Sequence, residues 1–372
     1  MRILIASDKF KGSATGAEVA AALRDGIRSV REDAVIEQVP VADGGEGTVD
    51  AALAAGFTAD AAEVTGPVGD PVTARFAVRG RQAIIEMAAA SGLDVLPGGV
   101  RAARAATSRG TGDLIRAALD RGCISIVLGI GGSANTDGGA GMLQALGVSL
   151  TDASGRSFPA VARRSHPWRR WTSRVWTRRI AEAEIVLASD VDNPLLGERG
   201  AAAIFGPQKG ASVADVAELD AALAHFAELL EQQPGVRPSI SAAGSGAAGG
   251  VGYAALAVLG ARREPGVEVV QRLTGLADRV VGADLVITGE GSLDDQSLGG
   301  KTPLGVAAVA RAAGVPVIAV CGRSTLDAGA VASAGFARVY ALSEIEPDSA
   351  KSIANAKSLL VDVGRRIAAD LF

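Results

Sequence analysis

Residues 1–47 read MRILIASDKFKGSATGAEVAAALRDGIRSVREDAVIEQVPVADGGEG, and their pattern decides the fold. A short apolar run at 3–6 predicts a strand, and apolar residues recur over 15–31 with the spacing of an amphipathic helix. A second strand is expected at 35–41. Because strand, helix and strand follow one another in this order, the segment predicts a parallel, right-handed βαβ unit.

The same rhythm returns near the end of the chain. A strand followed by a loop is expected at 283–291, a helix at 302–314 and another strand at 315–322, and residues 349–370 have the pattern of a last amphipathic helix. These segments share the alternation of the N-terminal segment. The simplest topology is one α/β domain built from both chain ends.

Between these ends the sequence pattern no longer alternates between strand and helix. Short runs of β character at 58–90 are separated by Gly-Pro, Asp-Pro and Arg-Gly pairs, which is typical of hairpin strands. We therefore predict two domains: residues 1–62 plus 283–372 form the first, and residues 63–282 form a second α/β domain inserted into it.

Composition excludes several functional classes. The 372 residues carry a net charge of −4 with only 3% aromatic residues, which argues against a nucleic-acid surface. The first residues lack the long apolar stretch of a signal peptide, and the longest uncharged apolar segment, 241–260, holds six glycines. We expect a cytoplasmic protein that binds neither nucleic acid nor membrane.

Glycines and carboxylates gather directly after the expected strands. In an open α/β sheet, ligands bind beyond the carboxyl ends of the strands. Asp and Gly are also ordinary turn residues, which is the alternative explanation for any single case. Five such loops in one chain favour a ligand site: Asp8 and Lys9, Asp43–Gly47, Gly131–Gly139, Asp190–Asn193, and Gly289–Asp295.

Lysine is rare in this chain and unevenly placed. Only 6 of the 37 basic residues are lysines. Four of the six stand in the polar, glycine-containing stretches DKFKGS, FGPQKG and GGKT: Lys9, Lys11, Lys209 and Lys301. A compact ammonium group is a good point charge for phosphate. Chance placement is the alternative, since six residues are few.

Common nucleotide and hydrolase motifs are incomplete. The loop GGSANTDGG at 131–139 offers backbone amides to an anion, or is a plain helix start. The stretch around Lys301 fails as a Walker A motif because Asp295 stands where glycine is required, and Ala134 breaks a dinucleotide fingerprint. No serine-hydrolase elbow is present. Carboxylates, lysines and glycine loops remain, and these are typical of magnesium-assisted phosphoryl transfer.

Six sequence blocks resemble the bacterial glycerate kinase family, of the two-domain type I. They are IASDKFKGS (5–13), VADGGEGT (41–48), GIGGSANTDGGAGMLQALG (129–147), SDVDNPLLG (189–197), GAAAIFGPQKGA (200–211) and ITGEGSLDDQSLGGKTPLGVA (287–307). The resemblance implies transfer of the γ-phosphoryl group of ATP to D-glycerate, with Mg²⁺. It also implies that the domain built from both ends is flavodoxin-like or Rossmann-like.

The site residues we expect fall into four groups. The catalytic residues are Asp190, Lys11, Lys9 and Asp8, with Asp190 preferred as the base. Nucleotide and phosphate would contact Gly131, Gly132, Ser133, Gly289, Gly291 and Lys301. Glycerate would contact Asp43, Gly44, Gly45, Asn193 and Lys209. Asp43 and Asp294 would hold Mg²⁺. Which glycerate hydroxyl reacts, and which carboxylate is base and which is ligand, stay open.

One segment departs from the family pattern. Residues 161–179 hold seven arginines, all three tryptophans and no acidic residue. Like charges repel, so we expect a surface excursion there, and an arginine clamp for ATP phosphate is the alternative. A shifted reading frame or a diverged loop would explain the composition. Any contact that the family makes through this segment is in doubt.

Two other functions compete with the kinase. A nicotinamide-dependent oxidoreductase of a small hydroxy acid fits the α/β rhythm, but the broken fingerprint and the lack of a catalytic histidine count against it. A nucleotide-binding regulator without activity would leave the clustered carboxylates without a purpose. The oligomeric state is not indicated by the sequence.

Overall fold

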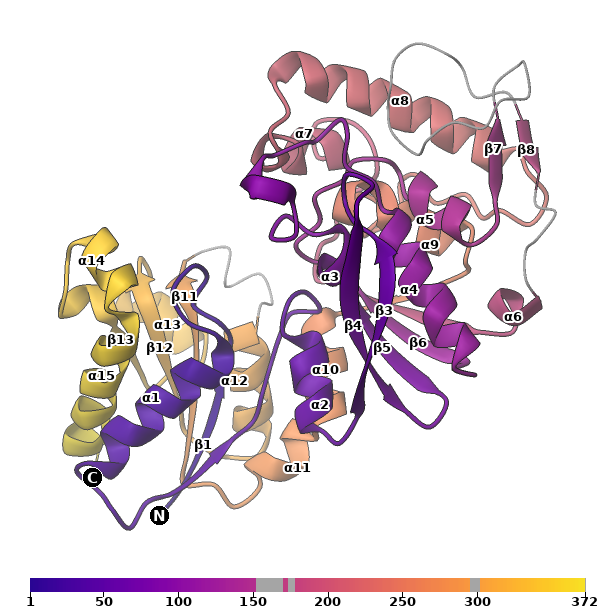
Figure 1. The fold of residues 1–372 in the computed structure, drawn as a ribbon. Helices are drawn as coiled ribbons and strands as arrows, with labels where there is room; N and C mark the ends of the chain where they lie inside the picture. Colours follow the sequence, from indigo (N-terminus) through magenta and orange to yellow (C-terminus); the bar gives the residue numbers. More distant parts are fainter. Residues whose placement is uncertain (152–169, 173–177, 295–301, 372) are drawn as a thin grey trace. The chain divides into compact units, whose positions relative to one another are not determined.

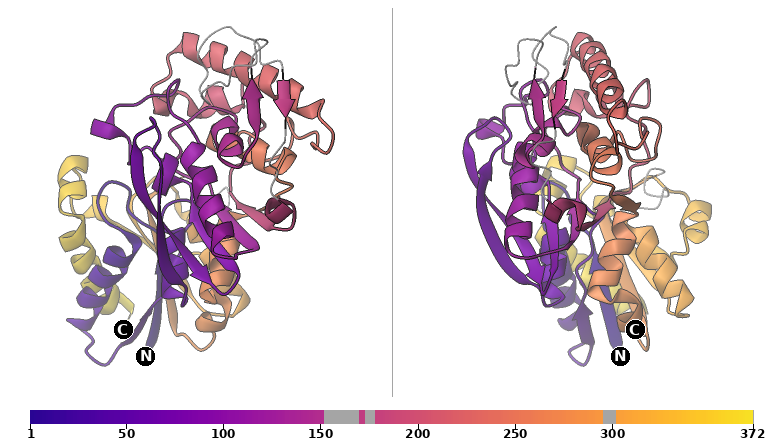
Figure 2. Two further views of the ribbon diagram at one scale, coloured as in Figure 1. Left: turned by 45° about the vertical axis from the view of Figure 1, so that its right-hand side comes forward. Right: turned by 90° about the vertical axis from the view of Figure 1, so that its right-hand side faces the viewer.

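The computed structural model describes residues 1–151, 170–172, 178–294 and 302–371. The chain divides into two compact units. Unit 1 comprises Met1–Asp43, Asp50–Ala55 and Val267–Phe372, and unit 2 comprises Gly44–Val49 and Gly56–Gly266. The indigo start and the yellow end of the chain therefore belong to one unit, and the purple and magenta segments to the other (Figure 1, Figure 2).

Unit 1 is built on a parallel sheet. Its strand order is β13-β12-β11-β1-β2, and every neighbouring pair is parallel. The strands are β1 (Arg2–Ser7), β2 (Val35–Gln38), β11 (Leu285–Leu293), β12 (Val317–Ser324) and β13 (Arg338–Ala341). The expected flavodoxin-like or Rossmann-like parallel sheet from both chain ends is thereby confirmed.

Helices cover both faces of this sheet, because alternate residues of β1 point to opposite faces. Ile3 and Ile5 join one buried cluster with α1 and α15, whereas Leu4 and Ala6 join a second cluster with α11 and α12 (Figure 1). The unit-1 helices are α1 (Gly16–Arg28), α11 (Leu276–Val280), α12 (Thr302–Ala312), α13 (Ala328–Ser333), α14 (Ser349–Ala354) and α15 (Ala356–Leu371). Two more, α2 (Thr48–Ala54) and α10 (Gly266–Thr274), cross the unit boundaries.

Unit 2 contains a mixed sheet of order β10-β9-β6-β5-β4-β3, in which only β3, β4 and β5 pair antiparallel. Its strands are β3 (Thr58–Thr65), β4 (Pro71–Arg79), β5 (Gln82–Glu86), β6 (Ser125–Gly129), β9 (Glu184–Ala188) and β10 (Arg262–Glu264). The hairpin texture expected at 58–90 is confirmed. A separate antiparallel pair joins β7 (Ser149–Thr151) to β8 (Arg170–Thr172).

The helices of unit 2 close around one apolar core, which the sheet strands share. They are α3 (Ala88–Ser91), α4 (Arg109–Asp120), α5 (Ala140–Ala145), α6 (Arg178–Ala181), α7 (Ala201–Phe205), α8 (Val213–Glu231) and α9 (Val251–Ala257). Ser212 caps α8 by accepting from the Asp215 amide, while the Asp215 carboxylate accepts from the Ser212 amide, and this capping box fixes the start of the helix.

Two boundaries differ from the sequence predictions. Unit 1 resumes at Val267 and not at 283, because Leu276 and Val280 bury their side chains in the unit-1 core. The single helix expected at 349–370 is two helices, broken at Asn355. The Asn355 side-chain amide donates to the Lys351 carbonyl at 3.0 Å and its backbone amide donates to the same carbonyl at 2.9 Å, so Asn355 caps the end of α14.

The arginine-rich segment 161–179 lies mostly outside the described residues. None of the helices described in the structure is long and apolar enough to cross a membrane.

Candidate active site

The candidate site of unit 1 lies where the winding of its sheet reverses. From β1 the chain moves through α1 to β2 on one side, whereas from β11 it moves through α12 to β12 on the other side. β1 and β11 are parallel neighbours, with Ser7 opposite Gly289, so their carboxyl ends lie together. Ligands of open α/β sheets bind at such a switch point.

The loop after β1 is fixed by backbone bonds to its neighbours. The Asp8 amide donates to the Gly289 carbonyl at 2.9 Å, and Phe10 pairs with Ala14 as an isolated bridge. A side chain on Gly291 would stand 3.4 Å from the Lys11 amide nitrogen, so the Lys9–Lys11 turn packs against β11. The two rare lysines are therefore held beside the end of β11.

Gly289 has a packing role that the sequence did not indicate. A Cβ at this position would lie 2.1 Å from the Val320 carbonyl oxygen of the neighbouring strand, a distance that no side chain tolerates. Glycine is required here by the sheet itself. The contact with phosphate that we expect of Gly289 stays a prediction beside this packing role.

Asp8 carries the most perturbed carboxylate of this region. Burial raises its pKa to about 6, and the nearby Asp43 carboxylate adds to the rise. Two hydrogen bonds to the Asp8 carboxylate oppose this rise in pKa. The Thr302 hydroxyl donates to Oδ2 at 2.7 Å, and the Lys9 amide donates to Oδ1 at 2.7 Å. Perturbed carboxylates of this kind gather at functional sites.

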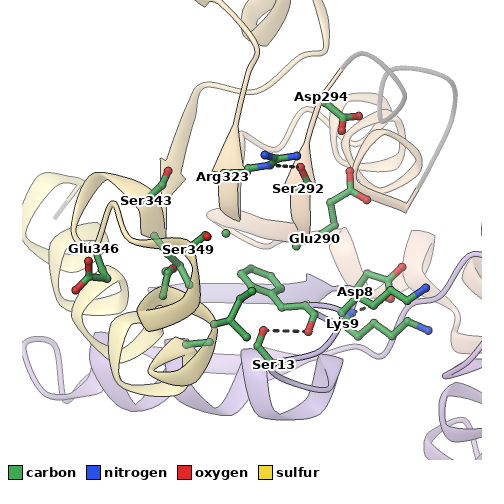
Figure 3. Close-up of a pocket in the computed structure, with 18 of the residues that line it drawn as sticks. Asp8, Lys9, Ser13, Glu290, Ser292, Asp294, Arg323, Ser343, Glu346 and Ser349 are labelled. Atoms are coloured by element: carbon green, nitrogen blue, oxygen red, sulfur yellow. Dashed lines mark hydrogen bonds between the residues drawn. The ribbon is translucent and has the colours of Figure 1, made fainter. Parts of the chain in front are cut away.

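A pocket of about 710 Å³ opens at these strand ends (Figure 3). Its polar end is lined by expected site residues, namely Asp8, Lys9, Lys11, Asp43, Gly291 and Asp294. Glu290, Ser292 and Arg323 line it as well, and the Arg323 guanidinium donates from Nε to the Ser292 hydroxyl at 3.2 Å. The volume is that of an ordinary small-molecule site.

The carboxylates of this pocket suit a magnesium ion that arrives with a nucleotide. Among residues 1–151, 170–172, 178–294 and 302–371, no three acidic, histidine or cysteine side chains are close enough to hold a metal ion. Mg²⁺ in kinase sites is bound through one or two carboxylates plus substrate phosphates, not by an all-protein cage. Asp43 and Asp294 line the same pocket and fit that mode.

In unit 2, glycines bring two loops into backbone contact. A side chain on Gly131 would stand 2.7 Å from the Gly45 Cα, and one on Gly44 would stand 2.8 Å from the Ala188 carbonyl oxygen. Gly44 also has a φ of +81°, which favours glycine. The Gly44–Gly45 turn therefore lies against the carboxyl ends of β6 and β9.

The following loop is tied to the backbone after α3. The Leu93 amide donates to the Gly132 carbonyl at 2.9 Å, and the Ala134 amide donates to the Ser91 carbonyl at 2.9 Å. Gly132 has a φ of +74°. Gly131, Gly132 and Ser133 are thus held in one conformation, with Ser133 buried.

Asp137 anchors the remainder of this loop from inside the unit. Its carboxylate accepts hydrogen bonds from the amides of Ser108, Gly139 and Gly141 and from the Asn135 side chain, at 2.8–3.2 Å. Burial raises the pKa of Asp137, and these donors oppose the rise.

Lys209 lies in the interior of unit 2. The side chain is 1% exposed, and its Nζ donates to the Asn135 carbonyl at 2.5 Å. Burial lowers the pKa of Lys209 to about 7, while the Asp137 carboxylate opposes that change. The lysine therefore supports the 131–139 loop from beneath, and the contact with glycerate that we expect of it stays a prediction.

The acidic loop after β9 holds two other expected residues. Asp190 accepts from the Gly266 amide at its Oδ1, at 2.9 Å. Asn193 donates from its side chain to the Arg199 carbonyl at 2.8 Å. Both side chains are therefore oriented by backbone partners within unit 2.

The structure distributes the expected residues over both units. Asp8, Lys9, Lys11, Asp43, Gly291 and Asp294 line one pocket in unit 1. Gly44, Gly45, Gly131, Gly132, Ser133, Asp190 and Asn193 belong to unit 2. Lys301 lies outside the described residues. Glu290 and Thr302 were not among the expected site residues, although they stand in the stretches ITGEG and GGKT.

Comparison with known proteins gives consistent matches over the whole chain. The model of the glycerate kinase family matches residues 3–371. The chain is 45% identical to the glycerate 2-kinase of Escherichia coli K12 over 345 residues, which are 92% of this chain and 90% of that protein. It is 42% identical to the glycerate kinase of Halalkalibacterium halodurans, over 98% and 97% of the two chains.

A solved structure agrees. The crystal structure of a putative glycerate kinase 2 from Salmonella typhimurium LT2 superimposes with a TM-score of 0.82 at 41% sequence identity. The match covers 100% of this chain and 98% of the other. This relative is similar to the chain in fold as well as in sequence.

Proposed function

This chain belongs to the glycerate kinase family, and we propose that it transfers the γ-phosphoryl group of ATP to the 2-hydroxyl of D-glycerate. The resemblance predicted from six sequence blocks is thereby confirmed. The activity is that of a phosphotransferase, so the oxidoreductase and the inactive regulator are set aside. The choice of the 2-hydroxyl follows the Escherichia coli relative, whose name specifies that position.

The unit-1 pocket carries the proposal. Lysines and carboxylates meet there at the switch point of a parallel sheet, as a site for a magnesium-bound nucleotide requires. A site for the glycerate alone would need no such combination of five carboxylates with two lysines.

In the reaction, a glycerate hydroxyl oxygen forms a bond to the γ-phosphorus while the bond from that phosphorus to the β,γ-bridging oxygen breaks. The hydroxyl proton passes to a carboxylate. We assign this base to Asp190, because the bond from the Gly266 amide fixes the carboxylate at the end of β9. The products are phosphoglycerate and ADP.

Lys9 and Lys11 stabilise charge during transfer. Each is a compact cation at the rim of the nucleotide pocket, suited to the oxygens of the transferred group and of the departing ADP. Asp8 orients this turn by accepting from the Lys9 amide at 2.7 Å.

Asp43 and Asp294 are the residues that would hold Mg²⁺. The ion, when bound, neutralises charge on the β- and γ-phosphate oxygens. A cytoplasmic location follows from the use of ATP.

Unit 2 contains the other residues for which we expect contacts with substrate. The backbone amides of Gly131–Ser133 are suited to phosphate, and Gly44, Gly45 and Asn193 to glycerate. This assignment of phosphate and glycerate contacts is supported by the hydrogen bonds that hold Gly131–Ser133 and Asn193 in one conformation. Their hydrogen-bond donors are therefore oriented before a ligand binds.

The position of the phosphate in the product tests the proposal. Phosphorus–proton correlation by NMR distinguishes coupling to the single proton at C2 from coupling to the two protons at C3. We expect 2-phosphoglycerate, and 3-phosphoglycerate would contradict the choice of hydroxyl while leaving the kinase activity intact.

A further inference from the structure

The unit-1 pocket has a second end that the phosphoryl chemistry does not use. We propose that this end, here called the base arm, binds the purine ring of ATP; the proposal rests on the kinase function. The base arm is lined by Phe10, Leu342, Pro347, Ile353 and Ala356. In Figure 3, Ser343, Ser349 and Glu346 mark this end, and Asp8 and Lys9 mark the opposite end.

The floor of the base arm is rigid. Phe10 is 2% exposed and Leu342 1% exposed, and both belong, with Ala356, to the buried cluster beneath α1 and α15. Because these side chains are locked by core packing, the arm exists before any ligand enters. A preformed apolar slot suits a flat ring, since little conformational entropy is lost on binding.

The rim combines apolar and polar groups in the way that an aromatic heterocycle needs. Ile353 on α14 is 53% exposed and forms one wall. The hydroxyls of Ser343 and Ser349 line the same end and can meet the polar ring edge. Glycerate, a small and fully polar acid, has no group for the apolar floor, so the nucleoside is the better occupant.

Charge fixes the direction of the nucleotide in the pocket. Glu346 lies at the base arm, where its Oε1 accepts from the Asp348 amide at 3.0 Å, and it would repel a phosphate group. Lys9 and Lys11 lie at the other end. The phosphates therefore point toward the ends of β1 and β11, and the base points toward α14.

Binding of ADP and of inorganic tripolyphosphate, measured by calorimetry, tests the proposal. An Ile353→Asp variant places a carboxylate against the ring, and we expect ADP affinity to fall by about tenfold or more. Tripolyphosphate has no base, so its affinity should change little. The KM for ATP should rise, whereas the KM for D-glycerate and kcat at saturating ATP should not. Val281→Asp is the matched control, because Val281 is 66% exposed and precedes β11 at the opposite end of the sheet.

A second variant guards against a folding artefact. Ser349→Trp adds a ring at an exposed position of α14 and should fill the arm, which lowers ADP affinity without lowering tripolyphosphate affinity. Unchanged ADP binding in both variants would overturn the proposal, and so would an equal loss for both ligands. If the wild-type protein binds ADP through the arm but leaves glycerate unphosphorylated, the proposed function fails while the base arm stands.

Discussion

The Lys209 ammonium nitrogen lies 2.5 Å from the carbonyl oxygen of Asn135, in the interior of unit 2. This bond joins the segment after α7 to the glycine loop that begins at Gly131. Asp137, two residues beyond Asn135, is buried in the same region and holds the loop through four further donors. The conformation of the loop thus depends on one buried lysine and one buried carboxylate.

Replacing this lysine should destabilise unit 2. In Lys209→Met the side-chain volume is kept but the Asn135 carbonyl loses its buried donor, at a cost of ~1–3 kcal/mol in unfolding free energy. Urea unfolding followed by circular dichroism measures the change. The control is Lys357→Met, which removes an exposed pair with Glu18 and should change the unfolding free energy by less than about 1 kcal/mol. Equal effects of the two substitutions would contradict the buried role.

The same lysine should make stability depend on pH. Its pKa is lowered to about 7 in the folded protein from an ordinary 10.5, because burial disfavours the charge. Between these values the unfolded chain binds a proton that the folded chain does not, so the free energy of unfolding rises with pH, by up to ~1.4 kcal/mol per unit. We expect the difference between wild type and Lys209→Met to widen from pH 7 to about pH 9. A constant difference across this range would show that Lys209 stays charged.

Lys11 should contribute to turnover more than to stability. Lys11→Ala removes a cation from the phosphoryl end of the pocket, and kcat should fall ~10²-fold or more, the scale of losing one electrostatic stabiliser. Lys357→Ala serves as a matched control on the surface of the same unit. Steady-state kinetics of both variants measure the two kcat values. A near-normal kcat in a folded Lys11→Ala protein would show that Lys11 is a surface residue without a role in turnover.

Asp190 should be required as a base. Asp190→Asn keeps an oxygen to accept from the Gly266 amide but removes basicity, so kcat should fall by ~10²–10⁴-fold with the fold intact. Asp192→Asn, two residues along the same loop, is the control and should retain activity because Asp192 is exposed. If kcat survives in Asp190→Asn, the residue is at most a positioning group.

Much of unit 1 could be predicted because its signals are local. The apolar spacing of 15–31 and the strand of β1 are read within a few residues, and both are confirmed. The break at Asn355 could not be predicted, because apolar periodicity continues across it while the backbone departs from helical values at this one residue, with φ −106° and ψ 15°. The chain returns to unit 1 at Val267 because Leu276 packs in the unit-1 core. This packing is a tertiary contact, which the local sequence does not reveal.

The candidate site shows the same division. Asp8, Lys9 and Asp43 could be predicted because carboxylates and lysines directly after strands meet at one edge of a parallel sheet. The burial of Lys209 could not, since a lysine beside glycines looks the same in a phosphate loop and beneath one. The packing role of Gly289 could not be predicted either, because its constraint comes from Val320, on another strand.

The proposed kinase activity is tested by measuring the phosphorylation of D-glycerate itself. Purified protein is incubated with ATP and Mg²⁺, ADP release is measured by a coupled assay with and without D-glycerate, and phosphoglycerate is quantified in the same samples. If the protein is a glycerate kinase, we expect that ADP release depends on D-glycerate. We also expect that one mole of phosphoglycerate forms for each mole of ADP. A folded protein that binds ATP but forms no phosphoglycerate at any Mg²⁺ concentration would contradict it.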